Sequence, residues 1–147
     1  APMLRAATLL LLLAPAALAQ PAAQWAAVPG PAPGPARSVG GTALGCLAGA
    51  AQLPPEGPGW QAVRLSRNRN WAHPETVRWL QAFAARTRAA GLPDLLVGDM
   101  SQPRGGPMPF GHASHQSGLD IDIWLDVTPG RPPLTRQQRE DWPVPSL

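Results

Sequence analysis

The chain has 147 residues, which suits one domain with a buried core. Its formal net charge is +3, and all 12 of its basic residues are arginine. So small an excess of positive charge gives no argument for any class of partner. No nucleic-acid partner is expected, because the arginines are not clustered among aromatic residues along one element. The nearest approach to such a cluster is Arg64, Arg67 and Arg69, which we interpret first as a solvated loop and second as an anion contact.

The N-terminal segment has the pattern of a secretory signal peptide. Arg5 precedes an apolar run of Ala and Leu that ends at the small-residue pattern Ala17-Leu18-Ala19. We therefore assign residues 1–19 to a signal peptide, with a membrane anchor or a buried helix as alternatives. The run is short and is interrupted by Pro15, so no stable membrane span is expected after cleavage.

Residues 20–37 are rich in Pro, Ala and Gly and lack apolar periodicity, which predicts a disordered or extended linker. The folded domain is expected to occupy residues 38–147. Its first part, residues 39–60, is Gly-rich and favours tight turns over a long helix. The segment Val63–Leu65 is compatible with a short strand.

The clearest predicted helix covers Pro74–Ala90. Pro is favoured at the first helical position, and Gly91 follows where a left-handed residue often ends a helix. Four apolar residues recur at helical spacing and form one face. They are Val77, Leu80, Phe83 and Ala84. His73 directly precedes this helix and is interpreted as a capping or surface residue.

Three further elements are predicted downstream. Leu95–Val97 has the composition of a buried strand, and a Gly/Pro-rich loop follows over residues 101–111. Residue types alternate through Gly118–Leu125, which predicts a strand with one buried face. That face would consist of Leu119, Ile121 and Ile123. Thr135 and Gln138 have the spacing of a capping box, which predicts a final helix.

Two histidines and two aspartates lie close together in the sequence, at His112, His115, Asp120 and Asp122. A loop that leads into a strand can bring such groups to one end of a sheet, where they can converge on one ion. Zinc prefers imidazole and carboxylate ligands, and catalytic zinc sites keep one position open. Asp120 and Asp122 share one face of the predicted strand, and a divalent cation would offset their repulsion.

The residues alone leave two alternatives open. Asp122 would bind the ion while Asp120 orients a ligand histidine from behind. Otherwise the cluster would be a hydrogen-bonded loop clip that holds no metal, because short motifs produce false matches.

The segment GDMSQPRGGPMPFGHASHQSGLDIDIWL, residues 98–125, resembles the penicillin-insensitive murein endopeptidases. These enzymes belong to a wider group of zinc peptidases that includes lysostaphin-type enzymes, D-Ala-D-Ala metallopeptidases and the hedgehog signalling domain. Two upstream segments are similar to the same family in the same order, SVGGTALGCLAGAAQLP and NRNWAHPETVRWLQAFA. The resemblance covers residues 38–147. It implies an α+β fold in which a small antiparallel sheet with flanking helices carries the metal on one face.

The resemblance implies a zinc site whose first motif maps onto His115 and Asp122, with His112 at a further metal-contacting position. It also implies a His-x-His motif that supplies another zinc ligand and an assisting histidine, but no His follows His115 in the sequence. The family cysteine at Cys46 pairs with a distant cysteine, and Cys46 is the only cysteine present. We therefore expect that the sequence is cut short before the zinc site is complete and that the fragment alone is inactive.

The reaction implied by the resemblance is hydrolysis of the D-alanyl–meso-diaminopimelyl cross-link of peptidoglycan, without an acyl-enzyme. We thus expect a periplasmic zinc endopeptidase whose partner is peptidoglycan. Arg104 precedes the histidines and is a candidate contact for a substrate carboxylate or oxyanion, although a solvent-facing loop arginine is the simpler interpretation. The alternatives are a non-catalytic zinc- or peptidoglycan-binding remnant and a D,D-carboxypeptidase or dipeptidase of the same superfamily.

Overall fold

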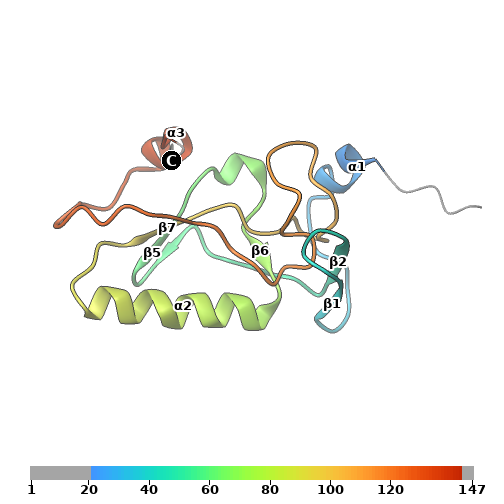
Figure 1. The fold of residues 1–147 in the computed structure, drawn as a ribbon, viewed down its shortest axis with the longest axis horizontal. Helices are drawn as coiled ribbons and strands as arrows, with labels where there is room; N and C mark the ends of the chain where they lie inside the picture. The colour runs from blue at the N-terminus through green and yellow to red at the C-terminus, as the bar shows by residue number, and fades with distance from the viewer. Residues whose placement is uncertain (1–20, 144–147) are drawn as a thin grey trace, which may run out of the picture.

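A four-stranded sheet of order β4-β5-β7-β8 forms the centre of the computed structural model, which describes residues 21–143 (Figure 1). The predicted signal peptide lies outside the described residues. The strands are β4 (Glu56–Gly57), β5 (Trp60–Ala62), β7 (Leu95–Val97) and β8 (Ile123–Trp124). The α+β class is confirmed, and the sheet is mixed, because β5 and β7 pair in parallel. Helix α2 (Pro74–Ala89) supplies the crossover that a parallel pair requires.

The ends of α2 follow from its local sequence. The Nδ1 atom of His73 accepts a hydrogen bond from the backbone N–H of Glu75 at 3.2 Å, so His73 caps the helix as predicted. Gly91, at φ 83°, follows the last turn in the left-handed region. The buried face of the helix consists of Val77, Leu80 and Ala84, with Phe83 half-buried beside them.

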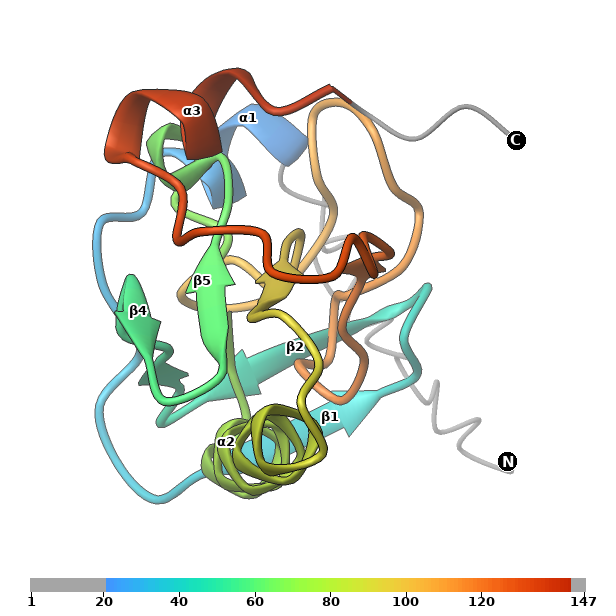
Figure 2. The same ribbon diagram turned by 90° about the vertical axis from the view of Figure 1, so that its left-hand side faces the viewer.

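Apolar clusters cover both faces of the sheet, and Figure 2 shows α2 end-on along one face with α3 (Arg136–Asp141) on the opposite side. The larger cluster joins α2 to the sheet and consists of Leu53, Trp60, Ala62, Ala72, Val77, Leu80, Ala84, Val97 and Met100. The smaller one consists of Val63, Leu96 and Leu134, with Trp124 and Trp142 packed against it. The side chain of Gln61 fixes the segment before α3 through hydrogen bonds to the backbone of Leu134 at 2.8 and 2.9 Å.

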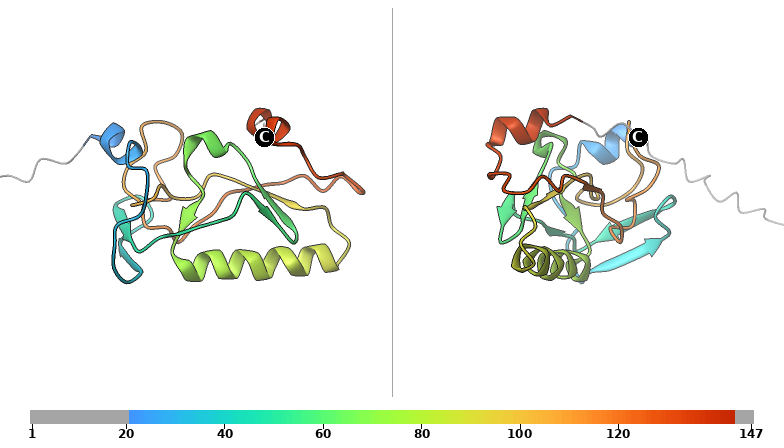
Figure 3. Two further views of the ribbon diagram at one scale, coloured as in Figure 1. Left: turned by 180° about the vertical axis from the view of Figure 1, so that it is seen from behind. Right: turned by 60° about the vertical axis from the view of Figure 1, so that its left-hand side comes forward.

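Two small antiparallel pairs complete the described fold. The hairpin of β1 (Arg37–Gly40) and β2 (Gly45–Ala48) lies at the same end of the molecule as α1 (Ala22–Ala26), as Figure 3 shows. Strand β3 (Ala51–Gln52) pairs with β6 (Trp71–Ala72), directly before α2. The Gly-rich region therefore forms turns and short strands, as the sequence predicts.

Residues 21–37 differ from the extended linker that their composition predicts. Helix α1 places the indole of Trp25 against Gly106, where an added Cβ would collide with the ring. The carbonyl oxygen of Ala32 also accepts a hydrogen bond from the N–H of Gly49 at 3.0 Å. Partial burial of the tryptophan and these backbone contacts offset the entropy lost on ordering, which the composition by itself could not reveal.

The strand expected at Val63–Leu65 is also wrong. Strand β5 ends at Ala62, and only the N–H of Val63 continues the ladder, with a hydrogen bond to the carbonyl oxygen of Val97 at 2.9 Å. Arg64 then adopts a left-handed conformation at φ 51°, and a single 3-10 turn, η1 (Leu65–Arg67), follows. A left-handed residue turns the chain out of the strand direction.

The strand predicted over Gly118–Leu125 is shorter than expected, because only β8 is regular. Ile121 and Ile123 pack against the main core as the alternation predicts, whereas Leu119 is 54% exposed. The capping box is confirmed: Thr135 and Gln138 exchange both hydrogen bonds at the start of α3. Within residues 21–143, no helix combines the length and apolar character needed to cross a membrane.

Candidate metal centre

The loop that carries the two histidines is fixed by hydrogen bonds at several points. The N–H of Gln116 donates to the carbonyl oxygen of Thr42 at 2.9 Å, and its side-chain amide donates to Ala43 and Ala113. The carbonyl oxygen of Gly118 accepts from the N–H of His73 at 3.0 Å. The β1–β2 turn and the start of α2 therefore hold the loop from two sides.

Asp122 is positioned from the sheet. Its N–H donates to the carbonyl oxygen of Asp99 at 3.0 Å, and its own carbonyl oxygen accepts from the N–H of Gly98 at 3.0 Å. These two bonds extend the β7–β8 pairing by one residue. They place the carboxylate of Asp122 at the end of the sheet, next to the loop that carries His112 and His115.

The structure brings three of the predicted site residues together: His112, His115 and Asp122. One potential ligand atom from each lies within 4.8 Å of the others. Oδ2 of Asp122 is 3.4 Å from Nδ1 of His112 and 3.4 Å from Nε2 of His115. The two imidazole rings meet edge to face, with their centroids 4.9 Å apart.

This geometry fits a zinc ion. A tetrahedral ion with ligand bonds of about 2.1 Å separates its ligand atoms by about 3.4 Å, which is the spacing of Asp122 from both histidines. His115 is 1% exposed, and neither ring nitrogen has a hydrogen bond of acceptable geometry among the described residues. A loop clip without metal would use those nitrogens as donors or acceptors, since unpaired buried polar atoms are costly.

Asp120 lies behind His115, on the side away from Asp122. Its Oδ2 atom accepts a hydrogen bond from the backbone N–H of His115 at 3.2 Å and is 2.8 Å from Nδ1 of the same residue. The contact with Nδ1 is close but lacks hydrogen-bond geometry, so its effect is electrostatic. This position suits a carboxylate that orients a ligand histidine better than a carboxylate that binds the ion itself.

Sequence reasoning missed a charged group beside the cluster. Asp99 is 2% exposed, and its Oδ2 atom forms ion pairs with Arg69 at 2.8 Å and with Arg67 at 3.0 Å. The same oxygen lies 3.6 Å from Nε2 of His112. Arg69 is buried, so a solvated loop is the wrong interpretation for it, and the anion that both arginines contact is a carboxylate of this chain. The available signal was an acidic residue two positions after the end of the buried strand β7.

Two other predicted residues stand apart from the cluster. Arg104 is exposed, and its side chain forms no hydrogen bond or ion pair within the part of the chain that the structure describes. Its backbone carbonyl instead accepts from the N–H of Leu47 at 2.9 Å. Cys46 is partly buried in β2, with a free thiol.

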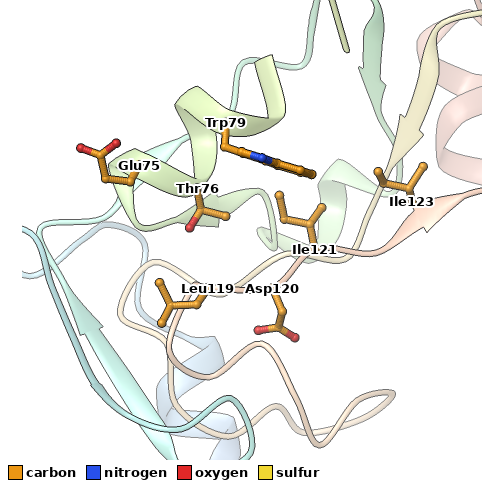
Figure 4. Close-up of a pocket in the computed structure, with 7 residues that line it drawn as sticks. All are labelled: Glu75, Thr76, Trp79, Leu119, Asp120, Ile121 and Ile123. Carbon is orange, nitrogen blue, oxygen red and sulfur yellow. The ribbon is translucent and has the colours of Figure 1, made fainter. Parts of the chain in front are cut away.

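A mainly apolar cleft of about 580 Å³ borders the cluster between α2 and the segment that leads into β8. It is lined by Glu75, Thr76, Trp79, Leu119, Asp120, Ile121 and Ile123 (Figure 4). Figure 4 shows Ile121 directed towards Trp79 and the carboxylate of Asp120 directed away from it. Asp120 is the lining residue that contacts the cluster. The three potential metal ligands, His112, His115 and Asp122, do not line the cleft.

Comparison with known proteins points to one family. The family model for penicillin-insensitive murein endopeptidases matches residues 38–147. A penicillin-insensitive murein endopeptidase from Haemophilus influenzae is 48% identical over 104 residues, which are 69% of this chain and 36% of that protein. Similar proteins of the same name from Yersinia pestis and Citrobacter koseri are 42% and 40% identical, over 72% and 82% of this chain. The chain covers 38% and 43% of their respective lengths, and so spans about two fifths of these relatives.

Proposed function

This chain belongs to the penicillin-insensitive murein endopeptidase family, and we propose that the protein is a zinc-dependent endopeptidase acting on peptidoglycan in the periplasm. The proposed reaction is hydrolysis of the D-alanyl–meso-diaminopimelyl cross-link. The relatives are named murein endopeptidases, which supports the substrate class. Expression with the predicted signal peptide, followed by cell fractionation, tests the location: recovery with cytoplasmic markers would contradict it.

The cluster of His112, His115 and Asp122 carries the proposal of zinc. Oδ2 of Asp122 has the spacing of a tetrahedral site from one ring nitrogen of each histidine, and the buried ring nitrogens of His115 lack hydrogen-bond partners among residues 21–143. The set contains no thiolate and a single carboxylate, which favours zinc over magnesium or calcium, because those ions require mostly oxygen ligands.

Each residue of the cluster has a proposed role. His115 and Asp122 hold the ion, His112 contacts it from the exposed side, and Asp120 orients His115 from behind. Zinc, when bound, supplies a Lewis acid that polarises the scissile carbonyl and makes a water molecule more acidic. The family resemblance assigns another zinc ligand and an assisting histidine to a His-x-His motif that is not among these 147 residues.

Zinc binding is tested on this chain by titration calorimetry of the metal-free protein. We expect one zinc ion per chain, and His115→Asn should weaken binding by at least about 10–100-fold, the usual cost of disturbing even an outer partner of a ligand. Asn is chosen because His115 has φ 66°, which Asn tolerates better than most residues. His73→Asn is the matched control, since it removes a histidine outside the cluster and keeps a capping side chain. Equal weakening by both variants would contradict the proposed site.

The reaction is tested on protein translated from the complete reading frame. Cross-linked muropeptide dimers should be converted to monomers, and a chelator should abolish the conversion, which added zinc restores. Release of only a terminal D-Ala would instead indicate a D,D-carboxypeptidase. Zinc binding without any product would indicate a non-catalytic binding protein.

A further inference from the structure

Arg67 is a cation at the edge of the metal cluster that the proposed zinc site does not use. Its Nη1 atom lies 3.0 Å from Oδ2 of Asp99, and the same oxygen lies 3.6 Å from Nε2 of His112. Arg67 and His112 therefore lie beside the same buried carboxylate oxygen. Their side chains are 21% and 36% exposed, so solvent reaches the cluster at both of them.

The carboxylate of Asp99 does not neutralise both arginines that contact it. Arg67 and Arg69 together bring two positive charges to one negative charge. Arg69 is buried, and its Nη1 and Nη2 atoms donate to Asp99 and to the carbonyl oxygen of Phe110. Arg67 forms a single ion pair within residues 21–143, and its Nη2 and Nε atoms reach solvent. The unbalanced positive charge is therefore accessible at Arg67.

The turn that carries Arg67 is held in an uncommon conformation. Arg64 and Asn68, which flank η1, have φ angles of 51° and 52°, and this left-handed region is unfavourable unless the surroundings impose it. Nη2 of Arg64 donates to the carbonyl oxygen of Trp142 at 2.9 Å. Oδ1 of Asn68 accepts from Nε1 of Trp71 at 2.8 Å. Contacts at both ends of the turn therefore fix the backbone from which the Arg67 side chain extends.

A substrate of the proposed reaction brings a carboxylate close to the scissile bond. The scissile amide nitrogen belongs to meso-diaminopimelate, and the carbon that bears this nitrogen also bears a carboxyl group. Arginine suits such a group, because its planar guanidinium can donate two parallel hydrogen bonds to a carboxylate. No hydrogen bond or ion pair in the described part of the chain holds Arg104, the arginine considered from the sequence, near the cluster.

We propose that Arg67 binds the carboxylate beside the scissile amide and makes the enzyme selective for diaminopimelate whose carboxyl group is free. This inference rests on the proposed function, from which it takes the cross-link. Asp120 and Asp122 repel an anion in the metal-free protein, whereas a divalent cation offsets their charge. The excess positive charge at Arg67 then favours an anionic substrate on the exposed side of the cluster.

The experiment compares two muropeptide dimers on zinc-loaded protein translated from the complete reading frame. The dimers differ only in the carboxyl group beside the scissile amide, which is free in one and amidated in the other. We expect a kcat/KM about 10–100-fold higher for the free-acid dimer, mainly through KM, because a hydrogen bond to a charged group contributes about that much. Arg67→Gln should lose this preference, and Arg67→Lys should regain part of it.

Arg86→Gln is the matched control. It removes an exposed arginine in the last turn of α2, whereas the loop of the cluster contacts the residue before the first turn. This variant should keep the preference for the free-acid dimer. Equal cleavage of both dimers by the wild-type enzyme would overturn the proposal, as would a full preference in folded Arg67→Gln. An equal loss in Arg86→Gln would also overturn it, because any lost positive charge would then have the same effect.

Binding of the monomeric product is a second readout that needs no turnover. The product carries the same carboxyl group, free or amidated, and calorimetry measures its affinity. If the wild-type protein cleaves neither dimer, the proposed function fails, and this affinity decides the role of Arg67: a preference for the free acid that Arg67→Gln lacks supports it, and equal binding overturns it. If Arg67→Gln does not fold, Arg67→Lys decides, because an undiminished preference in that variant would contradict paired hydrogen bonds from Arg67.

Discussion

His115 combines a strained backbone with a buried side chain whose ring nitrogens form no hydrogen bond among the described residues. Its φ of 66° lies in the left-handed region, which costs a residue other than glycine about 1–3 kcal/mol. The conformation persists because neighbouring groups hold the loop, above all Gln116, whose backbone and side chain bond to the β1–β2 turn. The imidazole points inward, with Nε2 3.4 Å from Oδ2 of Asp122. A ligand fixed in this way needs little reorganisation when an ion binds.

A residue outside the site gives the clearest dependence of stability on pH. The side-chain hydroxyl of Thr128, its backbone N–H and the charge of Arg131 hold the pKa of Asp126 below its ordinary value of 3.8. A lowered folded-state pKa contributes stability above the ordinary value, and this contribution is lost as the pH falls through the folded pKa. Thr128→Val should therefore lower the free energy of unfolding by about 1 kcal/mol at neutral pH and have little effect in strong acid.

Urea denaturation across the acid range measures this difference. Thr87→Val is the matched control, because the hydroxyl of Thr87 donates to the carbonyl oxygen of Ala84 at 2.9 Å, and neither group titrates. Its effect should not change with pH. A Thr128→Val effect that stays constant through the acid range would contradict the assignment.

Among the elements, helix α2 contributes most clearly to the core, because the apolar face predicted from its sequence packs against the sheet. Leu80 is fully buried at the centre of its apolar face, so Leu80→Ala should lower the free energy of unfolding by about 2–5 kcal/mol. Arg78→Ala on the same helix is the control, because the pair of Arg78 with Glu75 is exposed and should contribute less than about 1 kcal/mol. Thermal unfolding of both variants checks the contrast, and similar effects would argue against the packing described for α2.

The elements that could be predicted from the sequence are those with local signals. Helix α2, strand β7 and the capping box of α3 each have their caps, periodicity or bounding turns within a few residues. Strands β1 to β6 have two to four residues each and are defined by partners elsewhere in the chain. Composition cannot reveal such pairing, and it also missed the contact of Trp25 with Gly106 that orders residues 21–37.

The candidate site also contains residues that the sequence could predict and residues that it could not. His112, His115 and Asp122 were found because they are close in the sequence and lie on one loop and one strand. Asp99 and the two arginines that contact it come from earlier segments. The pairing of β7 with β8 brings Asp99 to the loop of His112, and backbone hydrogen bonds around Met100 bring Arg69 to Asp99. Charged residues that meet through sheet topology leave no spacing pattern in a single sequence.

For the whole molecule, the candidate metal cluster is a place where the proposed function would lower the stability of the fold. The buried cores lie on the two faces of the sheet, whereas the cluster lies at its end and joins the β1–β2 hairpin, the loop before β8 and the end of β7. In the metal-free state, both ring nitrogens of buried His115 lack hydrogen-bond partners among the described residues. Such groups lower the stability of the metal-free fold, and a bound ion would satisfy them.

Zinc should therefore raise the thermal stability of this chain. A free zinc concentration about 100 times the dissociation constant adds about 2.7 kcal/mol to the free energy of unfolding, which for a domain of this size corresponds to a rise in Tm of about 10 °C. Mg²⁺ should give almost no rise, because it prefers octahedral oxygen ligands. Scanning calorimetry of the metal-free chain, with each ion and with His115→Asn, measures the effect. An equal rise with Mg²⁺, or in the variant, would locate the stabilisation elsewhere, because the variant removes a proposed ligand and the proposed site disfavours Mg²⁺.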